Sequence, residues 1–407
     1  MTQYLSAGEA CERLGVKEAT LYAYVSRGLI RSEVGGGTTR KRRYLAEDVD
    51  KLVGRKEQRR DPAKVVEDAL HWGVPLLDSS ITLIADGRLY FRGQDAAELA
   101  RSQLLEDVAA LIWLDDMDAM LDLFRQPFPK VDLSAFAHLN LPMMARLQMA
   151  LTLASVQDFA AYDLSAAGAA RTGARILKGM GDALPPPQPS PASEGGSHSR
   201  MSIAETLAAA WSTEAAHLLN AAMVLCADHE LNASSFAARV TASVDANPYA
   251  VVQAGLAALQ GLKHGGHTSR VTAFMREVGQ VERVQQVIGE RLRRGDDLPG
   301  FGHRLYPEGD PRAQALMAML AEHAPDSPDF MLATAIAQAV TGVSGKLPTI
   351  DFALATLERV LGLPDGAALA LFALGRTVGW IGHAIEQYRA GAIIRPRARY
   401  VGRVPNG

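Results

Sequence analysis

The sequence predicts a mainly α-helical protein that carries a small helix–turn–helix domain at its N-terminal end. Apolar residues recur at helical spacing in residues 104–114, 143–154, 204–225 and 351–361. Alternation with period two, the sign of strands, is almost confined to one short stretch near residue 80. The first 60 residues differ from the rest in charge, which indicates a separate domain.

Length and composition set the broad class. The chain has 407 residues, enough for two or three domains, and is 48% hydrophobic and 21% charged. This composition excludes a wholly disordered chain. We find no run of 18 apolar residues and no basic start followed by an apolar segment, so we expect neither a membrane span nor a secretory leader. Two cysteines, Cys11 and Cys226, cannot form a disulfide framework, so we expect a cytoplasmic protein.

The charge is divided unevenly along the chain. Residues 1–60 contain 13 Lys and Arg against 8 Asp and Glu, a net of +5, whereas the whole chain has a net charge of −3. A basic head on an acidic body suggests two parts with different partners. We therefore expect one domain at 1–60 and a larger body at 61–407.

The head has the signals of two helices joined by a tight turn. Ser6 and Glu9 have capping-box spacing, and Gly15 can end the first helix. A second helix fits residues 17–27, followed by a short strand at residues 29–30.

A hairpin and a third helix complete the predicted head. The glycine-rich loop 35–39 and the basic run 40–44 can form a wing, and a helix fits from about Glu47.

Farther along, Asp86-Gly87 lies between two strand-like stretches and predicts a second hairpin. Residues 185–200 are rich in Pro, Ser and Gly and predict an exposed loop.

The C-terminal half contains the residues best suited to chemistry. His264 and His303 stand beside glycines, which allow backbone to approach a ligand closely, and Asp351 lies between Ile350 and Phe352. Desolvation there would raise the pKa of Asp351 toward that of a useful base. Arginines near turns can hold carboxylates with two parallel hydrogen bonds. Together these residues indicate a site for a small polyanion beside acid–base chemistry.

Simpler interpretations remain open for each residue alone. Either histidine can be a structural residue, Asp351 can cap the helix that follows it, and Arg395 can be an exposed tail charge. We expect no bound metal, because His264-x-x-His267 has no Cys or carboxylate partner nearby.

Several segments in this order resemble the citrate synthase family, over residues 73–402. They are LKHGGH, GFGHRLYPEGDPRA, TIDF, GRTVGW and IIRPRARYVG. The resemblance implies a large helical domain at about 61–225 and 352–407 and a small helical domain at about 226–351. It also implies a homodimer that shares its active sites and has no permanently bound cofactor, with an acyl-CoA as co-substrate.

The resemblance implies a role for each matching residue. Asp351 matches the base that deprotonates acetyl-CoA, His264 the histidine that binds the thioester oxygen, and His303 the histidine that polarises the ketone of oxaloacetate. The residues that match oxaloacetate-binding positions are His229, Arg312, Arg376 and, supplied across the dimer interface, Arg395.

This chain departs from the family pattern at three positions. The first histidine motif commonly continues HGGAN, whereas here His267 and Thr268 follow the two glycines. Pro307 stands where the family commonly has a Lys or Arg that binds CoA phosphates. We expect His267 to be a tolerated variation and leave CoA binding at Pro307 open.

The head resembles the winged helix–turn–helix of the MerR and excisionase type over residues 4–53. The resemblance implies that Thr20, Tyr22, Tyr24 and Arg27 lie on or near the helix that enters the major groove. Wing residues that would contact phosphates are Arg40, Lys41, Arg42 and Arg43. The alternative is a packing or dimerisation module without DNA.

These observations favour a synthase that condenses acetyl-CoA with oxaloacetate to give citrate and free CoA. A 2-methylcitrate synthase that uses propionyl-CoA is an alternative, since one methylene changes binding by only about 1–3 kcal/mol. A DNA-binding regulator whose synthase-like body senses a metabolite is another, and a related lyase acting on citryl-CoA is a minor third.

Overall fold

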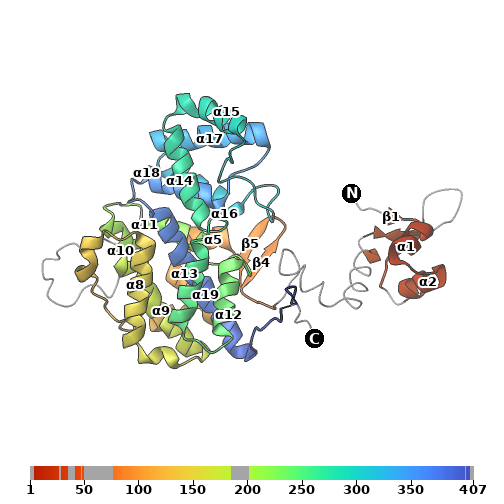
Figure 1. Cartoon of the computed structure of the whole chain (residues 1–407), viewed down its shortest axis with the longest axis horizontal. Helices are drawn as coiled ribbons and strands as arrows, with labels where there is room; N and C mark the ends of the chain where they lie inside the picture. The colour runs from red at the N-terminus through yellow and green to blue at the C-terminus, as the bar shows by residue number, and fades with distance from the viewer. Residues whose placement is uncertain are drawn as a thin grey trace. The chain divides into compact units, whose positions relative to one another are not determined.

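The computed structural model describes residues 4–26, 29–34, 42–46, 48–49, 77–184, 201–398 and 400–403 (Figure 1). It divides into two compact units, Met1–Asp78 and Ser79–Gly407. The predictions for Arg27, Arg40 and Lys41, for the start of a helix at Glu47 and for the loop 185–200 lie outside the described residues.

Within its described residues, the first unit contains a helix pair and a small antiparallel sheet. The elements described there are β1 (Tyr4–Leu5), α1 (Ala7–Leu14), α2 (Glu18–Ser26), β2 (Ser32–Val34) and β3 (Arg42–Leu45), and the strand order is β1-β3-β2. β2 and β3 are antiparallel, with Val34 opposite Arg42. This pairing is that of the predicted wing.

The ends of α1 confirm their sequence signals. The Ser6 amide donates to Glu9 Oε2 at 2.8 Å, and the Glu9 amide donates to Ser6 Oγ at 3.3 Å, so the capping box is complete. Gly15 ends the helix in the left-handed conformation at φ 59°.

The strand predicted at residues 29–30 is wrong. These residues form a bend, and β2 begins only at Ser32. The Leu29 amide donates to the Tyr24 carbonyl at 2.9 Å and so closes α2, while Ile30 is buried in the unit's own core. That core consists of Leu5, Ala10, Leu14, Leu21, Ile30, Tyr44, Ala46 and Val49.

The second unit begins with a three-stranded antiparallel sheet. Its strands are β4 (Thr82–Ala85), β5 (Arg88–Phe91) and β6 (Gln94–Asp95), in the order β4-β5-β6. Asp86 and Gly87 connect β4 to β5 with positive φ values of 51° and 73°, as a two-residue hairpin turn requires. The predicted hairpin is confirmed.

Helices make up nearly all the remaining described structure. The first group is α5 (Ala96–Ser102), α6 (Leu105–Leu114), α7 (Met120–Phe124), α8 (Met143–Gln157), α9 (Ala166–Ala183), α10 (Ile203–Ala210) and α11 (Ala216–Leu225). The second group is α12 (Ala233–Ala242), α13 (Pro248–Leu259), α14 (Gly266–Val278), α15 (Val284–Arg294), α16 (Pro311–His323), α17 (Pro328–Ser344), α18 (Ile350–Val360) and α19 (Ala367–Ala390). The helical spacing at 204–225 belongs to two helices, because Ser212 at φ 55° interrupts it.

Two hydrophobic cores organise the described residues of this unit. The larger one joins α5–α13, parts of α16 and α18, and α19. The smaller one joins α14, α15, α17 and α18, which gather at the top of Figure 1. α12 and α13 contribute to the larger core, although the predicted small domain, residues 226–351, includes both. That division of the body stays a prediction.

α19 is the central helix of the larger core. It packs against α6, α9, α11, α12 and α13. Its 24 residues are long and apolar enough to cross a membrane, but its apolar window is entirely buried inside the protein. Packing in the core accounts for this composition.

Candidate active site

His264 lies in a tight turn between α13 and α14. A Cβ on Gly265 would lie 2.6 Å from Leu259 Cδ1, and one on Gly266 would lie 2.6 Å from the Gln260 carbonyl oxygen. Both positions therefore require glycine for the backbone to approach this closely. The turn places His264 Nε2 2.8 Å from Ser234 Oγ in α12, which leaves Nδ1 as the nitrogen available to a ligand.

His303 and His229 meet around Tyr306. The rings of the two histidines are 5.2 Å apart, and His229 Nε2 lies 3.0 Å from the Tyr306 hydroxyl. The Leu305 amide donates to His303 Nδ1 at 3.2 Å. In a neutral ring the proton is therefore on Nε2, and His303 can donate a hydrogen bond from that nitrogen.

Arg312 is held by the residue that starts its own helix. Asp310 caps α16 and accepts from Arg312 Nε at 2.9 Å and from Arg312 Nη2 at 2.8 Å. Its Oδ2 also accepts from the Ile350 amide at 3.0 Å, at the start of α18. Burial acts to raise the pKa of Asp310, but the guanidinium of Arg312 outweighs it and holds this pKa below its usual value.

Arg376 is a buried cation in the middle of α19. Its side chain is almost fully enclosed, and Nε donates to the Cys226 carbonyl at 2.8 Å. Among the described residues, Nη2 has no hydrogen-bond partner. Burial lowers the pKa of this guanidinium, yet an arginine stays charged. A buried cation with a free donor is suited to an anionic ligand.

Asp351 is the second residue of α18 and does not cap the helix, because Thr349 occupies the N-cap position. Its Oδ1 accepts a hydrogen bond from Thr268 Oγ1 at 2.5 Å. Burial raises the pKa of the carboxyl, and the hydrogen bond from Thr268 opposes that effect. The sequence expectation of a desolvated carboxylate therefore agrees with its surroundings.

All three histidines are neutral at pH 7. Burial and the charge of Arg376 lower the pKa of His264 to about 4. Burial, followed by Arg312, lowers the pKa of both His303 and His229. Neutral imidazoles beside buried arginines can donate hydrogen bonds without adding further positive charge.

Six of the seven predicted catalytic and oxaloacetate-binding residues come together in the second unit. Arg312 acts on the pKa of His229, His303 and Asp351, and Arg376 acts on the pKa of His229 and His264. The rings of His229 and His303 are also in contact. Arg395 is exposed in the segment after α19, and within the described residues no hydrogen bond or ion pair joins it to the other six.

Sequence reasoning missed three supporting residues. Ser234 faces His264, Tyr306 contacts His229, and Asp310 orients Arg312. Tyr306 and Asp310 lie inside the segment GFGHRLYPEGDPRA, and their closeness to His303 in the sequence is the signal that could have indicated them.

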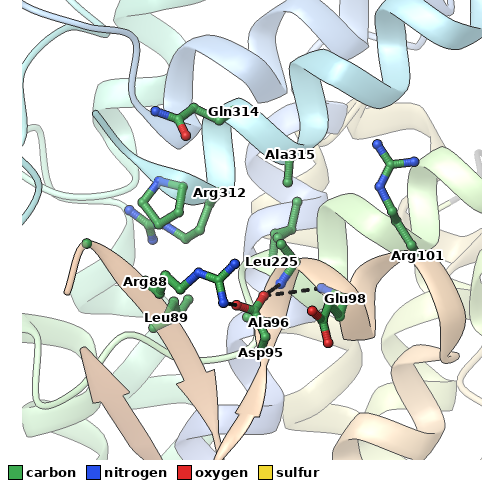
Figure 2. Close-up of a pocket in the computed structure, with 13 residues that line it drawn as sticks. Arg88, Leu89, Asp95, Ala96, Glu98, Arg101, Leu225, Arg312, Gln314 and Ala315 are labelled. Carbon is green, nitrogen blue, oxygen red and sulfur yellow. Dashed lines mark hydrogen bonds and ion pairs between the residues drawn. The ribbon is translucent and has the colours of Figure 1, made fainter. Parts of the chain in front are cut away.

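Arg312 also borders a cavity of about 360 Å³ (Figure 2). The hairpin, α5, Leu225 at the end of α11 and the first turn of α16 enclose it. Arg88 and Asp95 form an ion pair of 3.4 Å in its wall. The other five residues of the cluster do not line this cavity.

The residues predicted to contact DNA are partly described. Tyr22 is 48% exposed, Arg42 and Arg43 on β3 are exposed, and Thr20 and Tyr24 on α2 are half-buried. The wing therefore offers at least two cations to solvent.

Comparisons with known proteins agree with this fold. The family model described as "Citrate synthase, C-terminal domain" matches residues 69–397, and the one described as "Helix-turn-helix domain" matches residues 4–56. "Citrate synthase 2" of Bacillus subtilis is 30% identical over 81% of this chain and 94% of its own length. "2-methylcitrate synthase" of Mycobacterium tuberculosis is 28% identical over 77% of this chain and 84% of its own. The crystal structure of citrate synthase from Thermotoga maritima has a TM-score of 0.68 at 28% identity and covers 82% of this chain and 96% of that chain.

A mainly helical body with two buried arginines, three neutral histidines and a partly buried carboxylate defines an acid–base site for an anionic substrate. The chain belongs to the citrate synthase family, a family of acyltransferases, and carries an additional helix-turn-helix domain.

Proposed function

We propose that the body condenses an acyl-CoA, acetyl-CoA first among them, with oxaloacetate and releases citrate and free CoA. One observation carries the proposal: Asp351, a carboxylate with a raised pKa, belongs to the same cluster as two neutral histidines and two buried arginines. Deprotonation of a carbon acid needs such a base and hydrogen-bond donors, and binding of a dicarboxylate ketone needs such cations.

The first step is removal of a proton from the methyl carbon of the thioester. Asp351 takes this proton, and the electrons of the C–H bond move onto the thioester oxygen. We assign the proton of neutral His264 to Nδ1, with Nε2 accepting from the Ser234 hydroxyl, so that Nδ1 donates a hydrogen bond to this oxygen. A thioester α-proton is only weakly acidic, so the donor must stabilise the developing enolate by several kcal/mol.

The second step forms the carbon–carbon bond. The enolate carbon attacks the ketone carbon of oxaloacetate, and the proton on His303 Nε2 goes to the ketone oxygen. His229, Arg312 and Arg376 hold the two carboxylates so that the ketone faces the nucleophile. Hydrolysis of the resulting citryl-CoA by water then releases CoA and citrate.

Assembly and location are part of the proposal. We place Arg395 in the active site of the second subunit of a homodimer. This placement explains why Arg395, which matches an oxaloacetate-binding position, is exposed in a single chain. Cys11 and Cys226 are free thiols in different units, which supports a reducing cytoplasm.

A panel of acyl-CoAs tests the reaction. Purified full-length protein with oxaloacetate and acetyl-, propionyl- or butyryl-CoA should release free thiol, measured with a thiol reagent. Asp351→Asn should lower kcat by about 100- to 10,000-fold. Asp365→Asn, at an exposed ion pair with Arg276, is the control and should keep native turnover. Absence of thiol release from every acyl-CoA would contradict the proposal.

Mixed dimers test the shared site. Asp351→Asn and Arg395→Ala chains should each be nearly inactive alone. After subunit exchange at equal amounts, half of the dimers contain one intact site, so about a quarter of native activity should return. No recovery would show that Arg395 does not act across an interface.

A second activity, DNA binding, is favoured by the exposed wing. We propose that the first unit binds duplex DNA through α2 and through Arg42 and Arg43. In gel shifts of genomic fragments, binding should weaken steeply as salt rises. Arg42→Ala with Arg43→Ala should reduce the salt slope by about 2, whereas Arg283→Ala with Arg293→Ala, on exposed positions of the body, should not. Binding to no fragment at low salt would leave the head as a packing module.

A further inference from the structure

Thr268 lies next to the carboxylate proposed as the base. We infer that Thr268 is a positioning residue that fixes the orientation of the Asp351 carboxylate for proton abstraction. The inference rests on the proposed function, because it assigns a purpose to a contact of the proposed base. Thr268 is one of the residues at which this chain departs from the HGGAN pattern.

The contact is short, and its Thr268 side is buried. Thr268 is 1% exposed on the first turn of α14, and its hydroxyl donates to Asp351 Oδ1 at 2.5 Å. Within the described residues this is the only side-chain hydrogen bond that the carboxylate receives. A bond to Oδ1 limits rotation of the carboxylate and leaves Oδ2 for the substrate proton.

The neighbouring residue of the same motif holds the backbone beside Asp351. His267 Nε2 accepts from the Gly300 amide at 3.0 Å, and the Gly300 carbonyl accepts from the Thr349 amide at 2.8 Å. Thr349 is the N-cap of α18, two residues before Asp351. Both unusual residues of the motif therefore reach the segment that carries the proposed base.

Glycine at position 300 is required for this arrangement. Gly300 has a φ of 93°, in the region that favours glycine, and an added Cβ would lie 3.0 Å from Val271 Cγ2. In this conformation the Gly300 amide donates to His267 while the Gly300 carbonyl accepts from the Thr349 amide.

The alternative is that Thr268 only fills space, and the pH dependence distinguishes the two roles. The hydroxyl lowers the pKa of Asp351 against the effect of burial, so its removal should raise that pKa. The other titratable groups that act on this carboxyl, or on which it acts, are His267, Arg312, Asp310, Cys226 and Arg376. Thr268→Val removes none of these groups, so a changed pKa of Asp351 reports the loss of the hydroxyl.

Two substitutions of Thr268 test the inference in the full-length protein. Thr268→Val keeps the shape and removes the hydroxyl, and it should lower kcat at pH 7 by about 10-fold. It should also move the acid limb of kcat to higher pH, because the base then binds its proton more tightly. Thr268→Ser restores a hydroxyl and should return both quantities toward those of the native protein.

Thr356→Val is the matched control. Thr356 is fully buried in the same helix as Asp351, but its hydroxyl donates to the Phe352 carbonyl at 2.9 Å. This variant should keep the native kcat and pH profile. An unchanged acid limb in Thr268→Val, or a serine variant as slow as the valine variant, would overturn the inference.

A second measurement separates this inference from the proposed reaction. Carbon-13 NMR of the Asp351 carboxyl, assigned with Asp351→Asn, follows its titration without any turnover. A higher pKa in Thr268→Val than in the native protein supports the contact even if no acyl-CoA reacts. Equal pKa values in both proteins refute it even if the native enzyme is active.

Discussion

Replacement of Arg376 should separate ligand binding from stability. Arg376 is 1% exposed, and within the described residues its Nη2 has no partner. The folded protein thus keeps a desolvated cation without the neutralising bidentate contact seen at Arg312. We expect that the oxaloacetate dianion supplies this contact. The charge of Arg376 should therefore stabilise the protein only when oxaloacetate is bound.

The magnitudes follow from the contacts. Arg376→Met removes at least one charge-assisted hydrogen bond to the ligand, worth about 1.5–3 kcal/mol, so oxaloacetate should bind about 10- to 150-fold more weakly. Without ligand, the variant leaves the Cys226 carbonyl unpaired, at a cost of about 1–3 kcal/mol. Loss of a buried, incompletely paired charge offsets that cost, so the free protein should keep nearly its native stability.

Arg175 provides the matched comparison. This buried arginine forms two hydrogen bonds with buried Asp158, at 2.7 and 3.1 Å. Arg175→Met leaves that carboxylate without its cation and should cost about 3–5 kcal/mol, while oxaloacetate affinity should stay native.

Calorimetric titration with oxaloacetate and thermal unfolding with and without it measure both quantities. The native midpoint should rise with oxaloacetate, and the rise should be lost in Arg376→Met. Native affinity in Arg376→Met, or a destabilisation of the free protein as large as that of Arg175→Met, would refute the reasoning.

Three further predictions concern pH, the head and the backbone. The pKa of His264 falls from an ordinary 6.5 to about 4, so between these values the unfolded chain binds a proton that the folded chain does not, and stability is lost as pH falls. Thermal midpoints should therefore fall more steeply from pH 7 to pH 5 in the native protein than in His264→Gln; equal slopes would contradict the lowered pKa. Leu21→Ala opens a cavity in the separate core of the head and should cost that unit about 2–5 kcal/mol, seen as faster proteolysis of the head. Thiol release should be unaffected, and its loss would show that the body depends on the head. Gly300→Ala forces a Cβ against Val271 and should lower kcat, whereas Gly289→Ala, with no atom within 4 Å of the new Cβ, should not; equal activity would show that the backbone adapts.

The sequence predicted the local features because local patterns determine them. The Ser6–Glu9 capping box and the Asp86-Gly87 turn each depend on neighbours within a few residues, and both are present. The strand expected at residues 29–30 is absent because the Leu29 amide donates to the Tyr24 carbonyl and closes α2, a hydrogen bond that residue type alone does not reveal.

The site was predictable in its main residues but not in their partners. Family motifs indicated Asp351 and His264, whereas the Thr268–Asp351 bond joins residues 83 positions apart. His267, which we expected to be a tolerated variation, contacts Gly300, 33 positions away. Contacts over such separations come from the packing of α14 against α18, which helical periodicity does not specify.

Asp310 gives two functions a common anchor. One of its oxygens accepts from the Arg312 backbone and side chain, and the other accepts from both the Arg312 side chain and the Ile350 amide, one residue before Asp351. Arg312, proposed to bind the dianion, and the helix start that carries Asp351, proposed to take the proton, are thus hydrogen-bonded to the same carboxylate. A substitution that moves Arg312 to bind a different diacid would also displace Asp351. A change of diacid substrate in this protein should therefore also change the catalytic rate.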